Sequence, residues 1–272
     1  MKRIIIPTDF SEAAWHATEY GLKLAQELKT EVLLMHAYHE PKAGASNIIS
    51  IVDILRKDAE TEMNQVVQKI ERLELNKGIT VHNLCEHGDL IDVLSNHVAS
   101  HGNHMIVMGT QGATGIREAV FGTNTTDAIK KINSPVMVIP PHVQFGFENG
   151  ISCGIDDEVL ISSDDFHWLK GLTDINPDKA IELVNILVDE DESDDSLTNI
   201  PDQFQSLNHN FKQIINANVI DGLDHYVRQS NTDCLVIIKR NLNFFEKLFT
   251  RRTSSGLAAI AKCPLLIIRS AS

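Results

Sequence analysis

An internal repeat limits the fold of this chain more than any other feature of its sequence. Residues 133–139 (NSPVMVI) recur as residues 262–268 (KCPLLII), 129 positions later, and the same offset places 104–108 (HMIVM) over 233–237 (DCLVI). Residues 151–156 (ISCGID) resemble the opening segment 3–9 at a larger offset of 147. Repetition of this kind predicts two copies of one structural unit.

The offset between the copies falls by 18 residues from the first pair of segments to the last. We attribute the loss to a long helical pattern at 47–75, because the corresponding part of the second copy holds only an acidic stretch, 189–195, and a short helical pattern near 201–207. The copies join around residues 142–150. The predicted domains are therefore residues 1–143 and 144–272, each long enough to bury its own core.

Within the first copy, strand-like and helix-like segments alternate. Such alternation predicts right-handed βαβ units and a parallel sheet with helices on both faces. We therefore expect an α/β protein with two Rossmann-like, doubly wound domains of the adenine nucleotide alpha hydrolase-like type, each with a five-stranded, mainly parallel sheet. Strands are expected at 3–8, 32–37, 79–85, 104–109 and 135–139, and helices at 11–28, 47–75, 89–100 and 123–132.

The charge of the chain argues against several partners. The formal net charge is −13, so long-range attraction to nucleic acid or to an anionic membrane surface is not expected.

The apolar runs are far shorter than the roughly 20 residues that span a bilayer, so no transmembrane helix is expected. The four cysteines are widely spaced without a CxxC pair, which predicts neither a disulfide framework nor a zinc site. We expect a cytoplasmic protein.

A glycine-rich segment, 108–115 (MGTQGATG), follows the fourth predicted strand, and Phe121-Gly122-Thr123-Asn124 opens the next helix. Ligands of open parallel sheets lie beyond the carboxyl ends of the strands. Glycines there allow unusual φ angles and a close approach of the backbone, and the helix N-terminus is a natural seat for phosphate. The alternative is a glycine-rich connection without a ligand.

The spacing Gly109-x2-Gly112-x9-Gly122-Thr123 resembles the G-x2-G-x9-G-[S/T] phosphate-binding motif of the universal stress protein family. The segments 6–11 (IPTDFS), 34–37 (LMHA) and 134–139 (SPVMVI) resemble the same family in the expected order. The resemblance covers residues 1–140 at full motif strength and about 150–270 as a degraded copy.

This resemblance implies a site for an adenine nucleotide, ATP, ADP or AMP, and leaves open whether Mg²⁺ accompanies it. Asp9 would accept hydrogen bonds from the ribose or adenine, or else cap the first helix. Ala37, where the family usually has valine, would face the adenine edge. Met108 would line the ribose and phosphate entry, or belong to the core. The remaining implied site residues are Pro7 and Thr8 on the wall, and Gly109, Gln111, Gly112, Gly122, Thr123 and Asn124 around the ribose and phosphates.

The sequence gives weaker evidence for a functional role of several other residues. His101 and His104 have a metal-like spacing but are expected to be solvated, and His36 is expected to be a satisfied, half-buried residue. Trp15 and Trp168 lie in corresponding helices and are expected to pack. The acidic stretch 189–195 lacks the ligand spacing of a calcium loop. No catalytic residue and no metal ligand is assigned.

The second copy differs at the equivalent site. At the 129-residue offset, Gly109, Gly112 and Gly122 fall on Ile238, Asn241 and Arg251, and only Asp156 survives as the counterpart of Asp9. We expect this half not to bind nucleotide. The closing strands 135–139 and 264–268 are apolar and uncharged, so we expect them to pair within one chain as a pseudo-dimer, with homodimers of whole chains as a further expectation.

These features predict a nucleotide-binding stress-response protein that acts as a nucleotide-dependent regulator or sensor. Two alternatives remain: a slow ATP hydrolase or phosphate-transfer enzyme of the same fold, and an interaction scaffold that the nucleotide stabilises.

Overall fold

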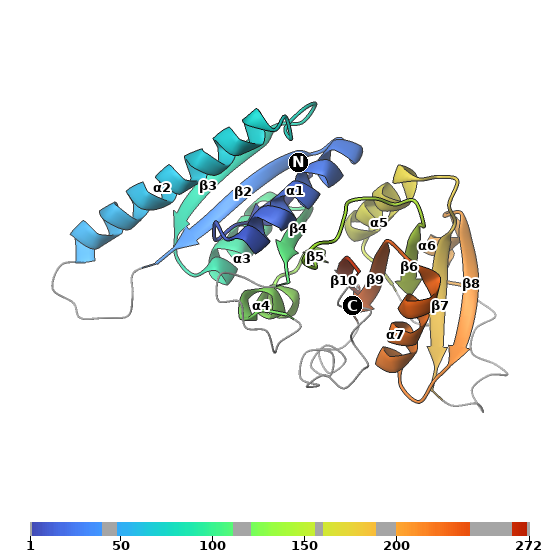
Figure 1. The fold of residues 1–272 in the computed structure, drawn as a ribbon. Coiled ribbons are helices and arrows are strands. Elements are labelled where there is room, and N and C mark those ends of the chain that lie inside the picture. Colours follow the sequence, from blue (N-terminus) through green and yellow to red (C-terminus); the bar gives the residue numbers. More distant parts are fainter. Residues whose placement is uncertain are drawn as a thin grey trace.

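The computed structural model describes residues 2–39, 48–110, 121–155, 160–188, 200–239 and 263–270. In these residues ten strands form one continuous sheet in the order β3-β2-β1-β4-β5-β10-β9-β6-β7-β8 (Figure 1). The first five strands and the last five have the same order, so the predicted repeat is a repeat of topology. Only β5 and β10, at the centre, pair antiparallel.

The first half follows the predicted alternation of strands and helices. Its central strands are continuous apolar runs, as expected where a parallel sheet is covered on both faces, and Ser11 caps the first helix by accepting a hydrogen bond from Ala14 N. The elements are β1 (Arg3–Pro7), α1 (Glu12–Glu27), β2 (Glu31–Tyr38), α2 (Ile48–Arg72), β3 (Val81–His87), α3 (Leu90–His101), β4 (His104–Gly109), α4 (Thr123–Lys131) and β5 (Val136–Ile139).

The second half repeats this plan with a much shorter element in the place of α2. Its elements are β6 (Ile151–Gly154), α5 (Ser163–Ile175), β7 (Ile181–Leu187), α6 (Asp202–Gln205), β8 (His209–Ile215), α7 (Val219–Ser230), β9 (Cys234–Lys239) and β10 (Leu265–Arg269). Trp15 in α1 and Trp168 in α5 lie in corresponding helices, as predicted.

Backbone hydrogen bonds confirm the 129-residue offset near the centre of the sheet. Ile106 N donates to Pro135 O at 2.8 Å, and Leu235 N donates to Pro264 O at 2.9 Å. Both residues of the second pair lie 129 positions after those of the first. The two inner strands of each half therefore hold the same register.

The change of offset lies between the two outer strands of each half. Val32 N donates to Thr80 O, and Ile181 N donates to Asn208 O in the corresponding place. The donors are 149 positions apart and the acceptors 128. The connection from β7 to β8 is therefore 21 residues shorter than that from β2 to β3, which confirms that the element equivalent to α2 is reduced.

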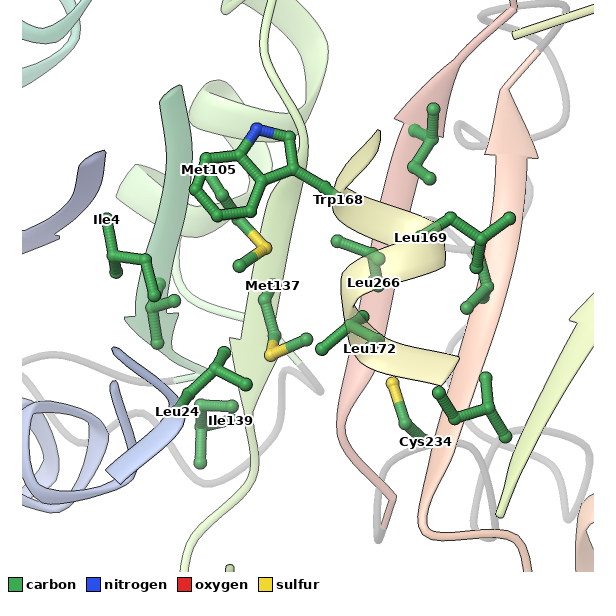
Figure 2. Close-up of a cluster of buried hydrophobic side chains, with 14 of the residues drawn as sticks. Ile4, Leu24, Met105, Met137, Ile139, Trp168, Leu169, Leu172, Cys234 and Leu266 are labelled. Carbon is green, nitrogen blue, oxygen red and sulfur yellow. The ribbon is translucent and has the colours of Figure 1, made fainter. Parts of the chain in front are cut away.

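The two halves share a core across the central strand pair. Met137 pairs with Leu266 in the β5–β10 register, and both side chains are completely buried. In Figure 2, Trp168 reaches from α5 towards Met105 on β4, and Leu172, one turn further along α5, lies near Met137. The closing strands thus join the halves as an intramolecular pseudo-dimer, as predicted.

One histidine differs from expectation. His104 opens β4 and is 1% exposed, whereas we expected a solvated side chain. Its ring lies 5.6 Å from that of His97, which stacks on the exposed His101 at 4.3 Å. Among the residues described, no group of His, Cys, Asp or Glu is arranged to hold a metal ion. None of the described helices is long and apolar enough to cross a membrane.

Candidate nucleotide site

The candidate site lies at the carboxyl ends of β1, β2 and β4. Strand β1 pairs with β2 on one side and β4 on the other: the chain runs outward from β1 through β2 to β3, and the connection after β3 crosses back to β4. This reversal is the topological switch point at which open α/β sheets bind ligands. Pro7, Asp9, Ala37 and Gly109 are all brought to this edge, as predicted.

The turn after β1 is fixed by hydrogen bonds to Thr8. Thr8 N donates to Met35 O at 2.8 Å, and His36 Nδ1 lies 2.8 Å from Thr8 O, which can only accept. Phe10 N donates to Thr8 Oγ1 at 3.0 Å, and Phe10 has a φ of 62°. The Phe10 ring lies 4.3 Å from that of His36. His36 is therefore the satisfied, half-buried residue we expected, and it rigidifies the wall of the site.

Asp9 is exposed at the mouth of this turn. Its Oδ1 accepts hydrogen bonds from Ser11 N at 3.1 Å and from Ser11 Oγ at 2.5 Å. Ser11 Oγ in turn accepts from Ala14 N at 3.2 Å. Ser11 is thus the N-cap of α1, and Asp9 orients the cap instead of forming it.

The N-terminus of α4 faces the same edge and has no side-chain cap. Its N-cap residue is Gly122, whereas Ser11, Asp89, Ser162 and Asn218 supply side-chain caps to α1, α3, α5 and α7. No acidic residue lies in the first turn of α4. In the part of the chain that the structure describes, no side chain caps its first N–H groups, and the positive end of its dipole favours an anion.

Two threonines hold this helix end against β4. Thr125 Oγ1 donates to Gly109 O at 2.9 Å, and Gly122 N donates to Thr110 O at 2.6 Å. Thr125 and Thr110 are buried, at 3% and 4% exposed. We did not predict either residue. The sequence offered only a weak signal for them: Thr110 directly follows Gly109, and Thr125 lies two positions after the expected helix start at Thr123.

The expectation of an unusual φ is wrong at Gly122. Its φ is −67° and its ψ 166°, an extended conformation open to any residue. The other reason we gave for glycine here, the close approach of a ligand, stays a prediction. Met108 is 5% exposed and belongs to a hydrophobic cluster against which Ala37 packs, so its side chain is part of the core. Gln111 and Gly112 lie outside the described residues.

The second half keeps part of this geometry. Ile155 N donates to Val184 O at 2.9 Å, as Thr8 N does to Met35 O, and Asn185 Nδ2 donates to Ile155 O at 3.1 Å in the place of His36. The counterpart of Gly109 is Ile238, whose side chain is buried. Asp156, Asn241 and Arg251 lie outside the described residues.

Fold and site together define a tandem α/β protein whose first half has the topological switch point of an open parallel sheet. Residues 1–140 match the sequence profile of the universal stress protein family. The match covers half of the chain, and the chain belongs to this family.

Relatives of single-domain length match about half of the chain. The chain is 31% identical over 156 residues to universal stress protein MJ0577 of Methanocaldococcus jannaschii, which covers 51% of this chain and 94% of the relative. It is 21% identical to universal stress protein YxiE of Bacillus subtilis over 144 residues, 50% of this chain and 97% of the relative.

A solved universal stress protein from Archaeoglobus fulgidus shares the fold of the whole chain. The superposition covers 99% of this chain and 97% of the other, with a TM-score of 0.74 and 16% identity. A protein from Pseudomonas aeruginosa PAO1, PA1789, is also similar over 98% of this chain, with a TM-score of 0.58 and 9% identity. Both halves therefore have the fold of the family.

Proposed function

We propose that the first half binds one adenine nucleotide, ATP, ADP or AMP, and that the protein is a nucleotide-dependent regulator or sensor of a stress response. The observation that carries the proposal is the uncapped N-terminus of α4, which is hydrogen-bonded to the carboxyl end of β4, the strand next to β1. Membership of the universal stress protein family supports the choice of ligand.

Each residue has a role that suits its position. The backbone N–H groups of Thr123 and Asn124 would bind phosphate oxygens, and Gly122 would let them approach. Asp9, exposed at the edge, would accept hydrogen bonds from the ribose hydroxyls or the adenine. Ala37 would contact the adenine. Met108 would contribute its backbone, because its side chain is buried. Pro7, Thr8 and Gly109 would shape the pocket, and Gln111 and Gly112 complete the proposed set.

Identification of the bound nucleotide tests the proposal directly. Purified protein is denatured, and the released small molecules are identified by mass spectrometry. Titration calorimetry with ATP, with and without Mg²⁺, should then give one site per chain at about micromolar affinity, roughly −8 kcal/mol. No binding, or two equivalent sites, would contradict the proposal.

The regulatory part needs a separate measurement. A sensor should capture a partner protein in one nucleotide state and release it in another. Capture that is independent of nucleotide would favour a scaffold, and steady release of ADP from ATP would favour a slow hydrolase. A cytoplasmic location and homodimers of whole chains remain predictions.

A further inference from the structure

A cavity lies between the two halves of the molecule. Its volume is about 520 Å³, within the range of small-molecule sites. The first half contributes the C-terminal ends of α3 and α4, and the second half contributes the start of α5 and the end of β10. Neither half could form this cavity alone.

Hydrogen bonds between the halves hold one wall of the cavity. Trp168 Nε1 donates to Asn103 Oδ1 at 2.7 Å, and Asn103 Nδ2 donates to Asp164 Oδ1 at 3.0 Å. The indole can only donate, so the Asn103 amide has one orientation. The carboxylate of Asp164 is therefore fixed relative to the first half.

Arg269 supplies positive charge to the lining of the same cavity. Its Nη2 donates to Lys130 O at 2.6 Å, and its Nε is buried without an acceptor. Among the residues described, no carboxylate lies within ion-pair distance of Arg269. A partly buried guanidinium that has no counter-charge among the described residues is unusual in a chain of net charge −13. Lys131, paired with Asp127 at 2.9 Å, adds a second cation to the lining.

Asp164 and Asp165 add acidic side chains to the lining. Asp165 is partly buried, and burial raises the pKa of its carboxyl group. Two carboxylates would repel a bare anion that filled the cavity. A ligand that fits must instead turn hydrogen-bond donors towards them and its negative group towards Arg269.

We propose that this inter-half cavity binds a small polar molecule with one anionic group, carboxylate or phosphate, at Arg269 and Lys131, and with ammonium or hydroxyl donors at Asp164 and Asp165. Amino acids and sugar phosphates share this chemistry. The site is separate from the proposed nucleotide site, because Lys131 ends α4 and Thr123 begins it.

Binding of defined probes to the full-length protein tests the proposal. The twenty amino acids, ribose 5-phosphate and inorganic phosphate are compared by thermal shift and then by calorimetry. We expect saturable binding of an amino acid or of the sugar phosphate, at least tenfold tighter than that of inorganic phosphate. Binding of an amino acid would identify the anionic group as a carboxylate, and binding of ribose 5-phosphate would identify it as a phosphate.

Variants then locate the bound probe. Arg269→Gln, Lys131→Gln and Asp165→Asn should each weaken binding at least fivefold. The matched control is Lys170→Gln. Like Lys131, Lys170 is exposed and forms an ion pair with an aspartate one helical turn away, Asp174 at 3.0 Å, but Lys170 does not line the cavity. Gly122→Val should leave this binding intact. The absence of binding by every organic probe, or binding unchanged in both Lys131→Gln and Asp165→Asn, would overturn the proposal.

Discussion

His36 and Asn185 occupy equivalent places in the two halves and make the same contact with different chemistry. The imidazole lies 2.8 Å from Thr8 O, and the Asn185 amide donates to Ile155 O at 3.1 Å. Asn185 Oδ1 remains buried without a donor, whereas the His36 ring packs against Phe10. The backbone at the end of the first strand is thus held in both halves, although the side chain has changed.

Gly122→Val should abolish ATP binding while the protein stays folded. The φ of −67° at this position is accessible to valine, so backbone strain is not the reason. The two added methyl groups would occupy the space through which phosphate approaches the N–H groups of α4. Calorimetry with ATP measures the loss, and circular dichroism measures the fold.

The matched control for this variant is Gly146→Val. A Cβ at Gly146 would meet no atom within 4 Å, and the residue lies outside the site. It should bind ATP like the parent protein. Unchanged ATP affinity in a folded Gly122→Val protein would remove the role assigned to α4.

Thr125→Val should weaken both stability and nucleotide binding. Valine has nearly the same shape but cannot donate to Gly109 O, and the loss of a buried hydrogen bond costs about 1–2 kcal/mol. Urea unfolding and ATP titration measure the two effects. Thr126→Val, one position on and partly exposed, should change either quantity by less than about 0.5 kcal/mol.

The sequence predicted this site to a limited depth. The position of Gly122 at a helix start, beyond the carboxyl end of the fourth strand, followed from the glycine spacing and from the alternation of strands and helices. The φ of Gly122 could not be deduced, because glycine is compatible with many conformations. The bond from Thr125 to Gly109 depends on how α4 docks on β4, a tertiary contact that local pattern does not contain.

At the scale of elements, apolar runs located the strands of the first half to within about two residues. Buried parallel strands are apolar on both faces, so their ends are marked by the first polar residues. The same reasoning fails at His104, a polar residue that the strand carries into the interior. Sequence alone could not show that α3 would cover it.

His104 should make the protein less stable as the pH falls. Burial, followed by the nearby His97, Arg3 and His101, lowers the pKa of His104 to about 4 from an ordinary value of 6.5. Between these values the unfolded chain binds a proton that the folded protein does not. Stability is therefore full above pH 6.5 and declines towards pH 4, by about 3 kcal/mol at most at about 1.4 kcal/mol per pKa unit.

Urea unfolding at pH 7 and pH 4.5 measures this decline. His104→Gln and His104→Leu remove the titrating group, so each should show a smaller decline than the parent protein. His167→Gln, an exposed substitution on α5, should retain the decline. An equal decline in both His104 variants would show that other groups cause the pH dependence.

At the scale of the whole molecule, the pairing of β5 with β10 was predictable and the cavity beside it was not. Two apolar, uncharged closing strands need a partner, and each is the other's counterpart in the repeat. The cavity depends instead on Asn103, Asp164 and Arg269, which are far apart in the sequence and have no motif in common. The boundary between residues 143 and 144 remains a prediction.

The continuous sheet and shared core predict that both halves unfold together, and the two tryptophans of the chain report on them separately. Trp15 lies on α1, with Lys69 Nζ 3.5 Å from its ring centre. Trp168 lies on α5 in the core that the two halves share (Figure 2). Trp168→Phe leaves a reporter of the first half, and Trp15→Phe leaves one of the second. Their fluorescence transitions in urea should share one midpoint.

Leu266→Ala, added to either reporter variant, tests the coupling further. It should lower the free energy of unfolding by about 2–5 kcal/mol and move both midpoints to lower urea concentration together. Two separated midpoints would mean that the halves are stable independently and that the central strand pair couples them only weakly.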